Sequence, residues 1–295
     1  MFVSSIEEVA RFTRPIHTIT RIFNEKTVSP GAATLFFVNG EGVAITCRHV
    51  VDLIGNRQAI NDHYEKFKKE KAAFGKNNKY HQRIKALEAA YHFKEDTIIQ
   101  LQEWFVGVTG EMNTRYRWIN HPKYDLSILI FEDFKNPLYQ SHARFLKDGS
   151  GLKQGKFLCR LGFPFPEFTN FRYNEATDNI EWTNSGQIET PRFPIEGMLT
   201  RHLISEKEIF GIELSSPGLR GQSGGPLFNA DGIICGMQTG TNHLHLGFDM
   251  KNFEYRINGR NIKVTNQPFL HVGHCIHVDI IKSFLKSNGI KFYEE

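Results

Sequence analysis

Gly221-Gln222-Ser223-Gly224-Gly225-Pro226 is the stretch on which the interpretation of the whole chain rests. A serine hydroxyl is a weak nucleophile until a neighbouring base removes its proton. Its attack on an acyl group creates an oxyanion, which backbone N–H groups on a tight glycine-containing turn stabilise well. The stretch therefore indicates Ser223 as a nucleophile, with the N–H groups of Gly221 and Ser223 as oxyanion donors. An ordinary glycine-rich turn is the alternative.

A base and a carboxylate that orients it must accompany such a serine, and they need not be near it in sequence. His49 follows the apolar run at 43–47, and Asp125 directly precedes the apolar run at 126–131. Alone, this histidine would more often be structural and this aspartate more often a strand cap or turn residue. Together, His49, Asp125 and Ser223 supply all three groups of a catalytic triad.

Most of the chain has the pattern of short β-strands separated by turn residues, which favours an antiparallel barrel or sandwich. Asn258-Gly259 suits a hairpin turn, because both residues tolerate positive φ. After the last strand, Asp279 resembles a helix N-cap, and a terminal helix is expected over 280–287. The expected strands are 33–38, 43–47, 126–131, 156–161, 209–214, 233–239, 255–257, 261–264 and 273–278.

One segment, residues 61–95, breaks the β pattern. Its aromatic and aliphatic residues recur at helical spacing on both sides of the turn at 75–78, amid many Lys and Glu residues. We therefore expect an inserted helical hairpin. Two roles remain open for it: a packed surface decoration, or a lid or partner-binding arm.

Several local strings resemble those of the chymotrypsin-fold serine peptidases. The similarity is greater to the bacterial HtrA (Deg) type, here without a PDZ domain, than to secreted digestive enzymes. It covers about 31–57 and 98–289. The strings that carry it are Thr46-x-x-His49-Val50, Tyr124-Asp125-Leu126-Ser127-Ile128-Leu129, Gly162-Phe163-Pro164, and Gly221 to Asn229 with the glycines at 232 and 236.

The resemblance implies an all-β fold of two antiparallel six-stranded β-barrels with a C-terminal helix, to which the inserted helical hairpin expected from the residue spacing is added. It implies a single peptidase domain over 1–295, divided into barrel 1 (about 14–135, with the insert at about 61–95), barrel 2 (about 150–278) and the helix (about 279–288). His49 would take the hydroxyl proton of Ser223 and return it to the leaving amine, while Asp125 fixes the imidazole tautomer. This chemistry needs no metal or cofactor, and its substrate is a protein or peptide.

Departures from the family pattern concern activation and specificity. Digestive members carry Asp where this chain has Gln222, so activation by an ion pair with a new N-terminus is not expected. Pro217 stands six residues before Ser223, where the family places the floor of its primary pocket. Without a carboxylate there, we expect cleavage after apolar or small residues. Thr239, Gly240 and Thr241 would bind the substrate backbone by strand addition. Together with Pro217, they are the residues expected to contact the substrate.

Composition and charge exclude several other classes of protein. The net charge of +4 is mildly basic, and no stripe of Lys and Arg interleaved with aromatics indicates a nucleic-acid partner. No apolar run approaches the roughly 18 residues of a membrane span, so no membrane partner is expected. The N-terminus lacks the basic start and apolar stretch of a signal peptide. A cytoplasmic protein is the expectation.

Cysteine and histidine spacing gives no strong metal signal. The cysteines are far apart and lie in apolar runs, where Cys packs as a small hydrophobe, so we expect free buried thiols; they are Cys47, Cys159, Cys235 and Cys275. On a strand, His274 would face away from His271 and His277, which argues against a metal site at that cluster.

Three functions compete for this sequence. The first is a serine endopeptidase that acts through an acyl-enzyme, with a regulated stress or defence pathway as its expected setting. The second is a latent or silent protease-fold module that recognises a regulatory partner through residues 61–95. The third is a serine esterase or acyl transferase, which would place its serine at a strand-to-helix elbow, whereas a proline and an apolar strand follow Ser223.

Overall fold

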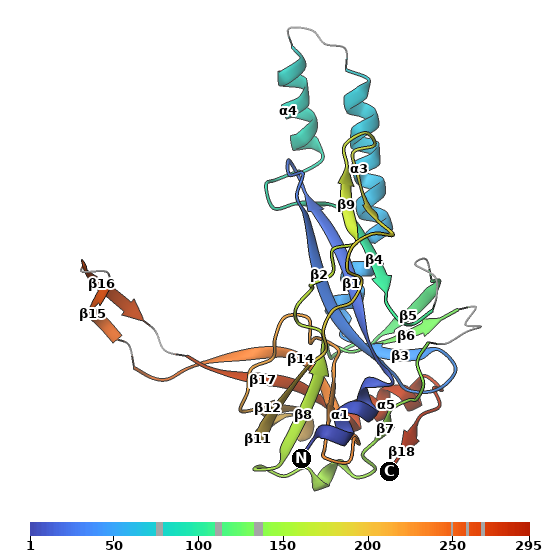
Figure 1. Cartoon of the computed structure of the whole chain (residues 1–295), viewed down its shortest axis with the longest axis vertical. Coiled ribbons are helices and arrows are strands. Elements are labelled where there is room, and N and C mark those ends of the chain that lie inside the picture. Colours follow the sequence, from blue (N-terminus) through green and yellow to red (C-terminus); the bar gives the residue numbers. More distant parts are fainter. Residues whose placement is uncertain (75–78, 110–113, 133–137, 249, 258–259, 267–268) are drawn as a thin grey trace.

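Two curled antiparallel sheets build the structure, a computed structural model that describes residues 1–74, 79–109, 114–132, 138–248, 250–257, 260–266 and 269–295. Figure 1 shows the long strands of the first sheet above the second sheet, with both chain termini at the lower end. The all-β fold class and the helical additions predicted from the sequence are confirmed. The two expected glycine- and asparagine-containing turns at 75–78 and 258–259 lie outside the described residues.

The first sheet has six strands in the order β4-β1-β2-β3-β6-β5. Its end strands β4 and β5 do not pair within the described part of the chain, and aromatic rings fill the seam between them. The Phe105 ring lies 4.8 Å from that of Tyr116 and 5.0 Å from that of Phe131. The strands are β1 (Thr13–Ile22), β2 (Val28–Phe37), β3 (Val43–Thr46), β4 (Ile98–Phe105), β5 (Tyr116–Asn120) and β6 (Ser127–Phe131).

The second sheet contains a closed ring of six strands in the order β13-β8-β11-β12-β17-β14, completed by pairing of β13 with β14. Two short strands, β7 and β18, extend it beyond β14. The strands are β7 (Arg144–Phe145), β8 (Phe157–Gly162), β11 (Phe193–Ser205), β12 (Glu208–Leu214), β13 (Pro226–Phe228), β14 (Ile234–His245), β17 (Phe269–His277) and β18 (Tyr293–Glu294), and a 3-10 turn, η1, spans Gly149–Gly151.

Strand β14 runs six residues past the expected end at 239, and it stays paired with β17 as far as His245 and Phe269. The sequence pattern missed this extension because residues 240–245 are mostly polar. Two-stranded backbone pairing needs no apolar face, so the ribbon leaves the barrel and continues toward the hairpin of β15 (Met250–Ile257) and β16 (Arg260–Asn266) (Figure 1).

Five helices accompany the sheets in the described residues: α1 (Val3–Ala10), α2 (Arg48–Gly55), α3 (Arg57–Ala72), α4 (Tyr80–Ala90) and α5 (Val278–Ser287). The helical insert therefore starts earlier than 61, since α2 and α3 follow each other directly after β3. The expected cap Asp279 is wrong. His277 is the N-cap of α5, because its Nδ1 accepts the backbone N–H of Asp279 at 3.3 Å.

The helical hairpin of α3 and α4 packs on the upper part of the first sheet (Figure 1). Its apolar contacts form a small core of Phe23, Tyr64, Phe67, Leu87 and Ile99. A hairpin of β9 (Phe171–Asn174) and β10 (Asn179–Trp182), for which the sequence offered no pattern, covers the same region. Its Asp178 carboxylate accepts hydrogen bonds from the Tyr64 hydroxyl at 2.7 Å and from Arg21 at 2.8 Å.

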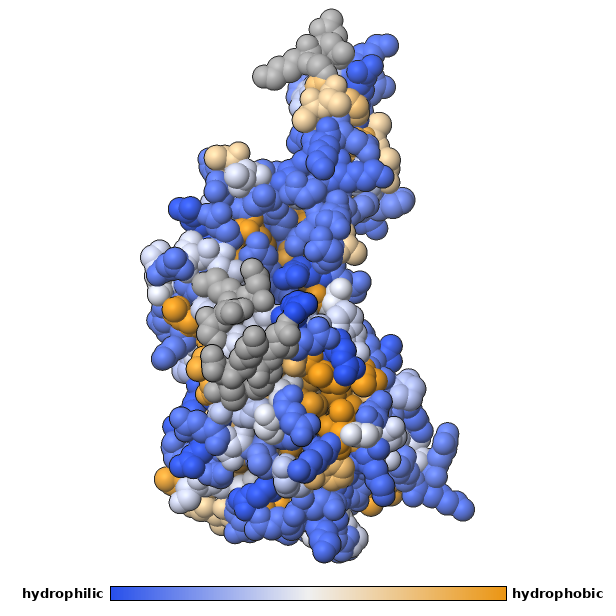
Figure 2. Space-filling model, turned by 90° about the vertical axis from the view of Figure 1, so that its right-hand side faces the viewer, coloured by the Kyte–Doolittle hydropathy of each residue, from blue (hydrophilic) through white to orange (hydrophobic). Residues whose placement is uncertain are grey.

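Figure 2 shows the face on the side of β5 and β6, where hydrophilic residues dominate the narrower upper part and an apolar patch lies in the broader lower part. Among the described residues, none of the helices has the length and apolar character needed to cross a membrane. All four cysteines are buried and free.

Candidate active site

His49 and Asp125 meet where β3 and β6 lie side by side. Strand β3 ends at Thr46, and Cys47 then serves as the extended N-cap of α2, which puts His49 in the first turn of that helix. Thr46 pairs with Ser127 at the start of β6, so Asp125 lies beside His49. The two Asp125 oxygens accept hydrogen bonds from the His49 backbone N–H at 2.9 Å and from the His49 Nδ1 at 2.8 Å.

The Asp125 carboxylate is stabilised in its ionised form. Partial burial alone would raise the pKa of Asp125, but hydrogen bonds from the His49 ring and backbone, with a smaller contribution from the Cys47 thiol, lower the pKa below its ordinary value. With both oxygens engaged by His49, the carboxylate fixes the ring orientation and leaves Nε2 to act on a substrate or nucleophile.

The Ser223 loop depends on two glycines in the left-handed region. Gly221 has φ +91° and Gly224 has φ +86°. A Cβ at Gly221 would lie 2.4 Å from the Phe163 carbonyl oxygen, and one at Gly224 would lie 2.1 Å from the Thr34 carbonyl oxygen. Only glycine fits both the backbone conformation and the space at these two positions.

Hydrogen bonds from both sheets hold this loop in place. Thr34 of β2 donates its N–H to the Ser223 carbonyl at 2.9 Å and its hydroxyl to the Gly221 carbonyl at 2.7 Å. The Gly224 N–H and the Cys47 thiol both donate to the Gln238 carbonyl, at 2.8 Å and 3.3 Å. Because Cys47 precedes His49 by two residues, this shared carbonyl brings the His49 segment next to the serine loop.

The Ser223 hydroxyl donates to the Thr239 carbonyl at 3.5 Å, and within the described chain no hydrogen bond joins it to the His49 ring. The N–H groups of Gly221 and Ser223 make no hydrogen bond to any described residue. Catalytic hydrogen bonds are often long or absent until substrate binds. Two free N–H groups beside a serine hydroxyl are the arrangement that an oxyanion requires.

Gln222 is fully buried and neutral, and it stabilises the loop through ordinary hydrogen bonds. Its side-chain oxygen accepts the Leu219 N–H at 3.1 Å, and its side-chain nitrogen donates to the Phe193 carbonyl at 3.1 Å. The loop is therefore held without the ion pair that digestive enzymes use there.

A cavity of about 390 Å³, which we call the specificity cavity, opens next to Ser223. Three of the four residues expected to bind substrate line it, and Thr241 links two of its walls by donating its hydroxyl to the Gly218 carbonyl at 2.7 Å. Thr239 lies outside the lining. The lining residues are Pro217, Gly218, Leu219, Arg220, Ser223, Gln238, Gly240, Thr241, His243 and His271.

Sequence reasoning missed the polar part of this lining. Gln238 and His243 belong to β14, His271 belongs to β17, and the buried Arg160 of β8 lies behind Gln238, with its Nη1 donating to the Gln238 side-chain oxygen at 2.7 Å. A lone arginine inside the apolar run at 156–161 was the one available signal.

The donor atoms of Cys47, His49 and Asp125 lie within 4.8 Å of one another, the one such group of three found among the described residues. Burial, and then the Asp125 charge, raise the pKa of the Cys47 thiol well above its ordinary value. A metal would need that thiol as a thiolate and would compete with His49 for Asp125. The group is explained by the histidine–aspartate pair, and it does not fit a metal site.

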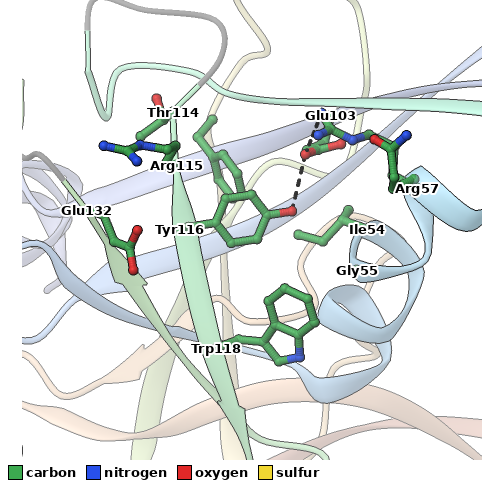
Figure 3. A pocket seen from close by; sticks show the side chains of 11 residues that line it. Ile54, Gly55, Arg57, Glu103, Thr114, Arg115, Tyr116, Trp118 and Glu132 are labelled. Carbon is green, nitrogen blue, oxygen red and sulfur yellow. Dashed lines mark hydrogen bonds and ion pairs between the residues drawn. The ribbon is translucent and has the colours of Figure 1, made fainter.

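A second cavity of about 400 Å³ lies in the seam of the first sheet, and we call it the seam cavity (Figure 3). The buried Glu103 carboxylate in its wall accepts a hydrogen bond from the Tyr116 hydroxyl at 3.2 Å and pairs with Arg57 at 3.1 Å. Burial raises the pKa of Glu103, and Arg57 and the Tyr116 hydroxyl counteract part of that rise. Trp118 and Gly55 close the lower side of the cavity as drawn.

The sequence profile described as "Trypsin-like peptidase domain" matches residues 33–237. Comparison with curated protein sequences finds no match.

Among solved structures, the HtrA-type protease AlgW with decapeptide is similar at a TM-score of 0.50 and 13% identity, over 97% of this chain and 67% of that chain. The Rv3671c protease from M. tuberculosis in its active form is similar at a TM-score of 0.48 and 11% identity, over 98% and 86%. At 13% identity, the likeness to AlgW concerns the fold alone.

Proposed function

This chain belongs to the trypsin-like peptidase domain family and is a serine endopeptidase, and on that basis we propose that Ser223 is its nucleophile, His49 its general base and Asp125 the carboxylate that orients the base. The observation that carries the proposal is the His49–Asp125 pair, held by hydrogen bonds of 2.9 Å and 2.8 Å, beside a serine loop whose N–H donors are free. No other group of the described chain offers this combination.

The reaction proceeds through an acyl-enzyme. His49 removes the Ser223 hydroxyl proton while the oxygen attacks the substrate carbonyl, and the N–H groups of Gly221 and Ser223 stabilise the oxyanion. His49 then protonates the leaving amine, and water repeats the sequence to release the acid. In the form described here the Ser223 hydroxyl must first rotate away from the Thr239 carbonyl, because it donates to that oxygen at 3.5 Å.

We propose that cleavage does not follow Lys or Arg, because the lining of the specificity cavity contains no Asp or Glu. The preference for apolar or small residues, inferred from Pro217, stays a prediction. Strand addition of the substrate along Gly240 and Thr241 is also part of the proposal, with Thr239 supporting Ser223 from outside the cavity.

Labelling with a fluorophosphonate tests the triad. Wild-type protein should be labelled, Ser223→Ala should not be labelled, and His49→Ala should be labelled at least about 10³-fold more slowly. Ser150→Ala, at an exposed serine of η1, is the matched control and should be labelled as wild type. Equal labelling of wild type and Ser223→Ala would contradict the assignment of the nucleophile.

A latent or silent module is the second candidate, and the Ser223–Thr239 contact favours it, since the serine does not engage His49. In that case a partner of the helical hairpin would assemble the triad. Wild type that resists labelling alone but is labelled when a protein that binds α3 and α4 is added would establish latency. Labelling without any addition would exclude it.

We also propose an intracellular role in regulated stress or defence proteolysis. Four buried, free thiols support a reducing compartment, where disulfides are rare. Fractionation of cells that produce the protein, followed by detection of the active-site label, would test the location. Label found only outside the cells would contradict it.

A further inference from the structure

Arg160 lies directly beneath the specificity cavity. It is a residue of β8 in register with Ile195 of β11 and Leu227 of β13, which places it inside the closed ring of strands. Its side chain is 0% exposed. The guanidinium reaches Gln238 and Pro217, two residues of the cavity lining, through Nη1 at 2.7 Å and Nη2 at 3.0 Å.

Every partner of this guanidinium is neutral. Besides Gln238 and Pro217, Nη2 donates to the Ser216 carbonyl at 3.1 Å and to the Ser216 hydroxyl at 2.6 Å. Nε is buried and has no hydrogen-bond partner among the described residues. Within the described residues no carboxylate pairs with Arg160.

The ionisable groups that act on the Arg160 charge are the thiols of Cys159 and Cys275. Burial raises the pKa of each thiol to about 12, so both are neutral at pH 7. Arginine stays protonated in proteins even where burial lowers its pKa. An isolated buried cation is costly, because the lost hydration is not replaced by an opposite charge. Such a charge is explained if its counter-ion arrives with the substrate.

Gln238 carries the influence of Arg160 to the cavity wall. A guanidinium only donates, so the Gln238 atom that faces it must be the oxygen, which also accepts from the Cys275 thiol at 3.3 Å. The amide nitrogen therefore points to the wall between Gly218 and Gly240: it donates to the Gly240 carbonyl and leaves a second N–H. A Cβ added at Gly218 would lie only 2.2 Å from this nitrogen.

The lining itself contributes one more positive charge, that of Arg220. Arg220 is exposed and pairs with no carboxylate in the described chain. His243 and His271 face each other with Nδ1 atoms 2.6 Å apart, so one ring nitrogen donates a hydrogen bond and the other accepts it. No lining residue is acidic.

We infer that the specificity cavity receives the carboxylate side chain of a Glu or Asp residue on the N-terminal side of the scissile bond, and that Arg160 determines this preference. The inference rests on the proposed triad, since the side chain next to the attacked carbonyl is the one that enters a cavity beside Ser223. The Gln238 amide donates to the incoming carboxylate, and the Arg160 charge behind it compensates the negative charge. An apolar side chain would leave the Arg160 charge uncompensated, so this inference competes with the preference for apolar or small residues expected from Pro217.

Four phosphonate probes that differ only in this side chain, Glu, Gln, Leu or Lys, would test the inference on the full chain. Their second-order rates of labelling at Ser223 measure the preference without turnover. Glu and Gln have the same shape, so their ratio isolates the charge. We expect Glu to react about 10- to 100-fold faster than Gln, the value of a hydrogen bond to a charged group.

Two variants test whether Arg160 causes the preference for Glu over Gln. Arg160→Met should remove the Glu-over-Gln ratio while Gln and Leu probes still react. Gln238→Glu keeps the length of the side chain and gives Arg160 an internal counter-ion, at the loss of the hydrogen bond to the Gly240 carbonyl, and it should favour Gln over Glu. Arg14→Met is the matched control, because Arg14 also donates to backbone carbonyls, including those of Gly107 and Ala10, but lies away from the cavity.

The outcomes separate the inference from the proposed function. Labelling by the simple fluorophosphonate with a Glu-to-Gln ratio near one, or with Leu preferred, overturns the acidic preference and leaves the triad standing. A Glu preference that persists in Gln238→Glu would show that Arg160 does not determine it. Failure of every probe, the simple fluorophosphonate included, would overturn both.

Discussion

The specificity cavity and the seam cavity have similar volumes, about 390 and 400 Å³, and each has a buried charged residue in or behind its wall. The two charged residues differ in the groups that contact them. Glu103 at the seam cavity pairs with Arg57 and accepts from Tyr116, whereas Arg160 behind the specificity cavity contacts only neutral atoms. A buried charge with its own counter-ion is explained within the fold, and we infer a binding site only beside the charge that lacks one.

The largest contrast concerns catalysis, tested by the same carboxylate-to-amide change at the histidine–aspartate pair and in the seam cavity. Asp125→Asn should lower kcat by about 10⁴-fold, because the amide leaves the His49 ring in the wrong tautomer. Glu103→Gln should leave kcat unchanged, since Glu103 touches neither Ser223 nor His49. Peptide hydrolysis by the purified variants measures both.

Equal losses in these two variants would break the comparison, because the seam cavity would then belong to the catalytic apparatus. Urea unfolding serves as the control for folding, and labelling by the fluorophosphonate gives a second readout of the contrast. Asp125→Asn should react slowly, and Glu103→Gln should react at the wild-type rate.

The next effect concerns stability and its dependence on pH. Arg57→Met removes the charge that counteracts the raised pKa of Glu103, so that pKa rises further. Below the ordinary pKa of 4.5, Glu103 is protonated in folded and unfolded chains alike, and the loss should be small. As pH rises through the folded pKa, an unpaired buried carboxylate must form, and the variant should lose about 1–3 kcal/mol of unfolding free energy.

Urea unfolding at pH 4 and pH 7 measures this difference. Arg117→Met is the control, because its partner Glu132 is 3.9 Å away and both side chains are largely exposed. Such surface pairs contribute at most about 1 kcal/mol. An Arg57→Met deficit that is the same at both pH values would contradict the role given to Glu103.

The smallest effect concerns one hydroxyl. Tyr116→Phe removes the bond to Glu103 and keeps the ring that packs on Phe105, so we expect a loss of about 1 kcal/mol in unfolding free energy and no change in kcat. Tyr80→Phe is the control, at a hydroxyl that bonds to no described residue. A loss above about 3 kcal/mol would mean that the Tyr116 hydroxyl does more than satisfy Glu103.

The triad residues could be proposed from sequence because each sits in a short string with local meaning. Gly221 and Gly224 mark a turn that only glycine permits, and the runs after Asp125 and before His49 mark strand ends. The strands could be placed for the same reason, since apolar runs bounded by turn residues are local signals. Their pairing into a closed second ring was supplied by the resemblance.

The specificity cavity could not be derived in this way. Arg160 and Gln238 are 78 positions apart, and their contact exists only because β13 pairs with both β8 and β14. Pro217 was identified by counting six residues back from Ser223. That count locates one residue of the cavity wall, but it gives no sign of the Arg160 charge behind the wall. The seam cavity could not be predicted from the sequence either. It exists because the end strands β4 and β5 do not pair with each other in the described chain, and local sequence patterns do not show which strands pair.

Thr34 gives the fold a property of a different kind. This one residue of the first sheet donates twice to the serine loop, and its carbonyl accepts the hydroxyl of Thr46, three positions before His49. The same residue therefore holds both the loop that carries Ser223 and the strand end that precedes His49. We therefore expect that a displacement of Thr34 relative to the second sheet would disturb the positions of Ser223 and His49 together.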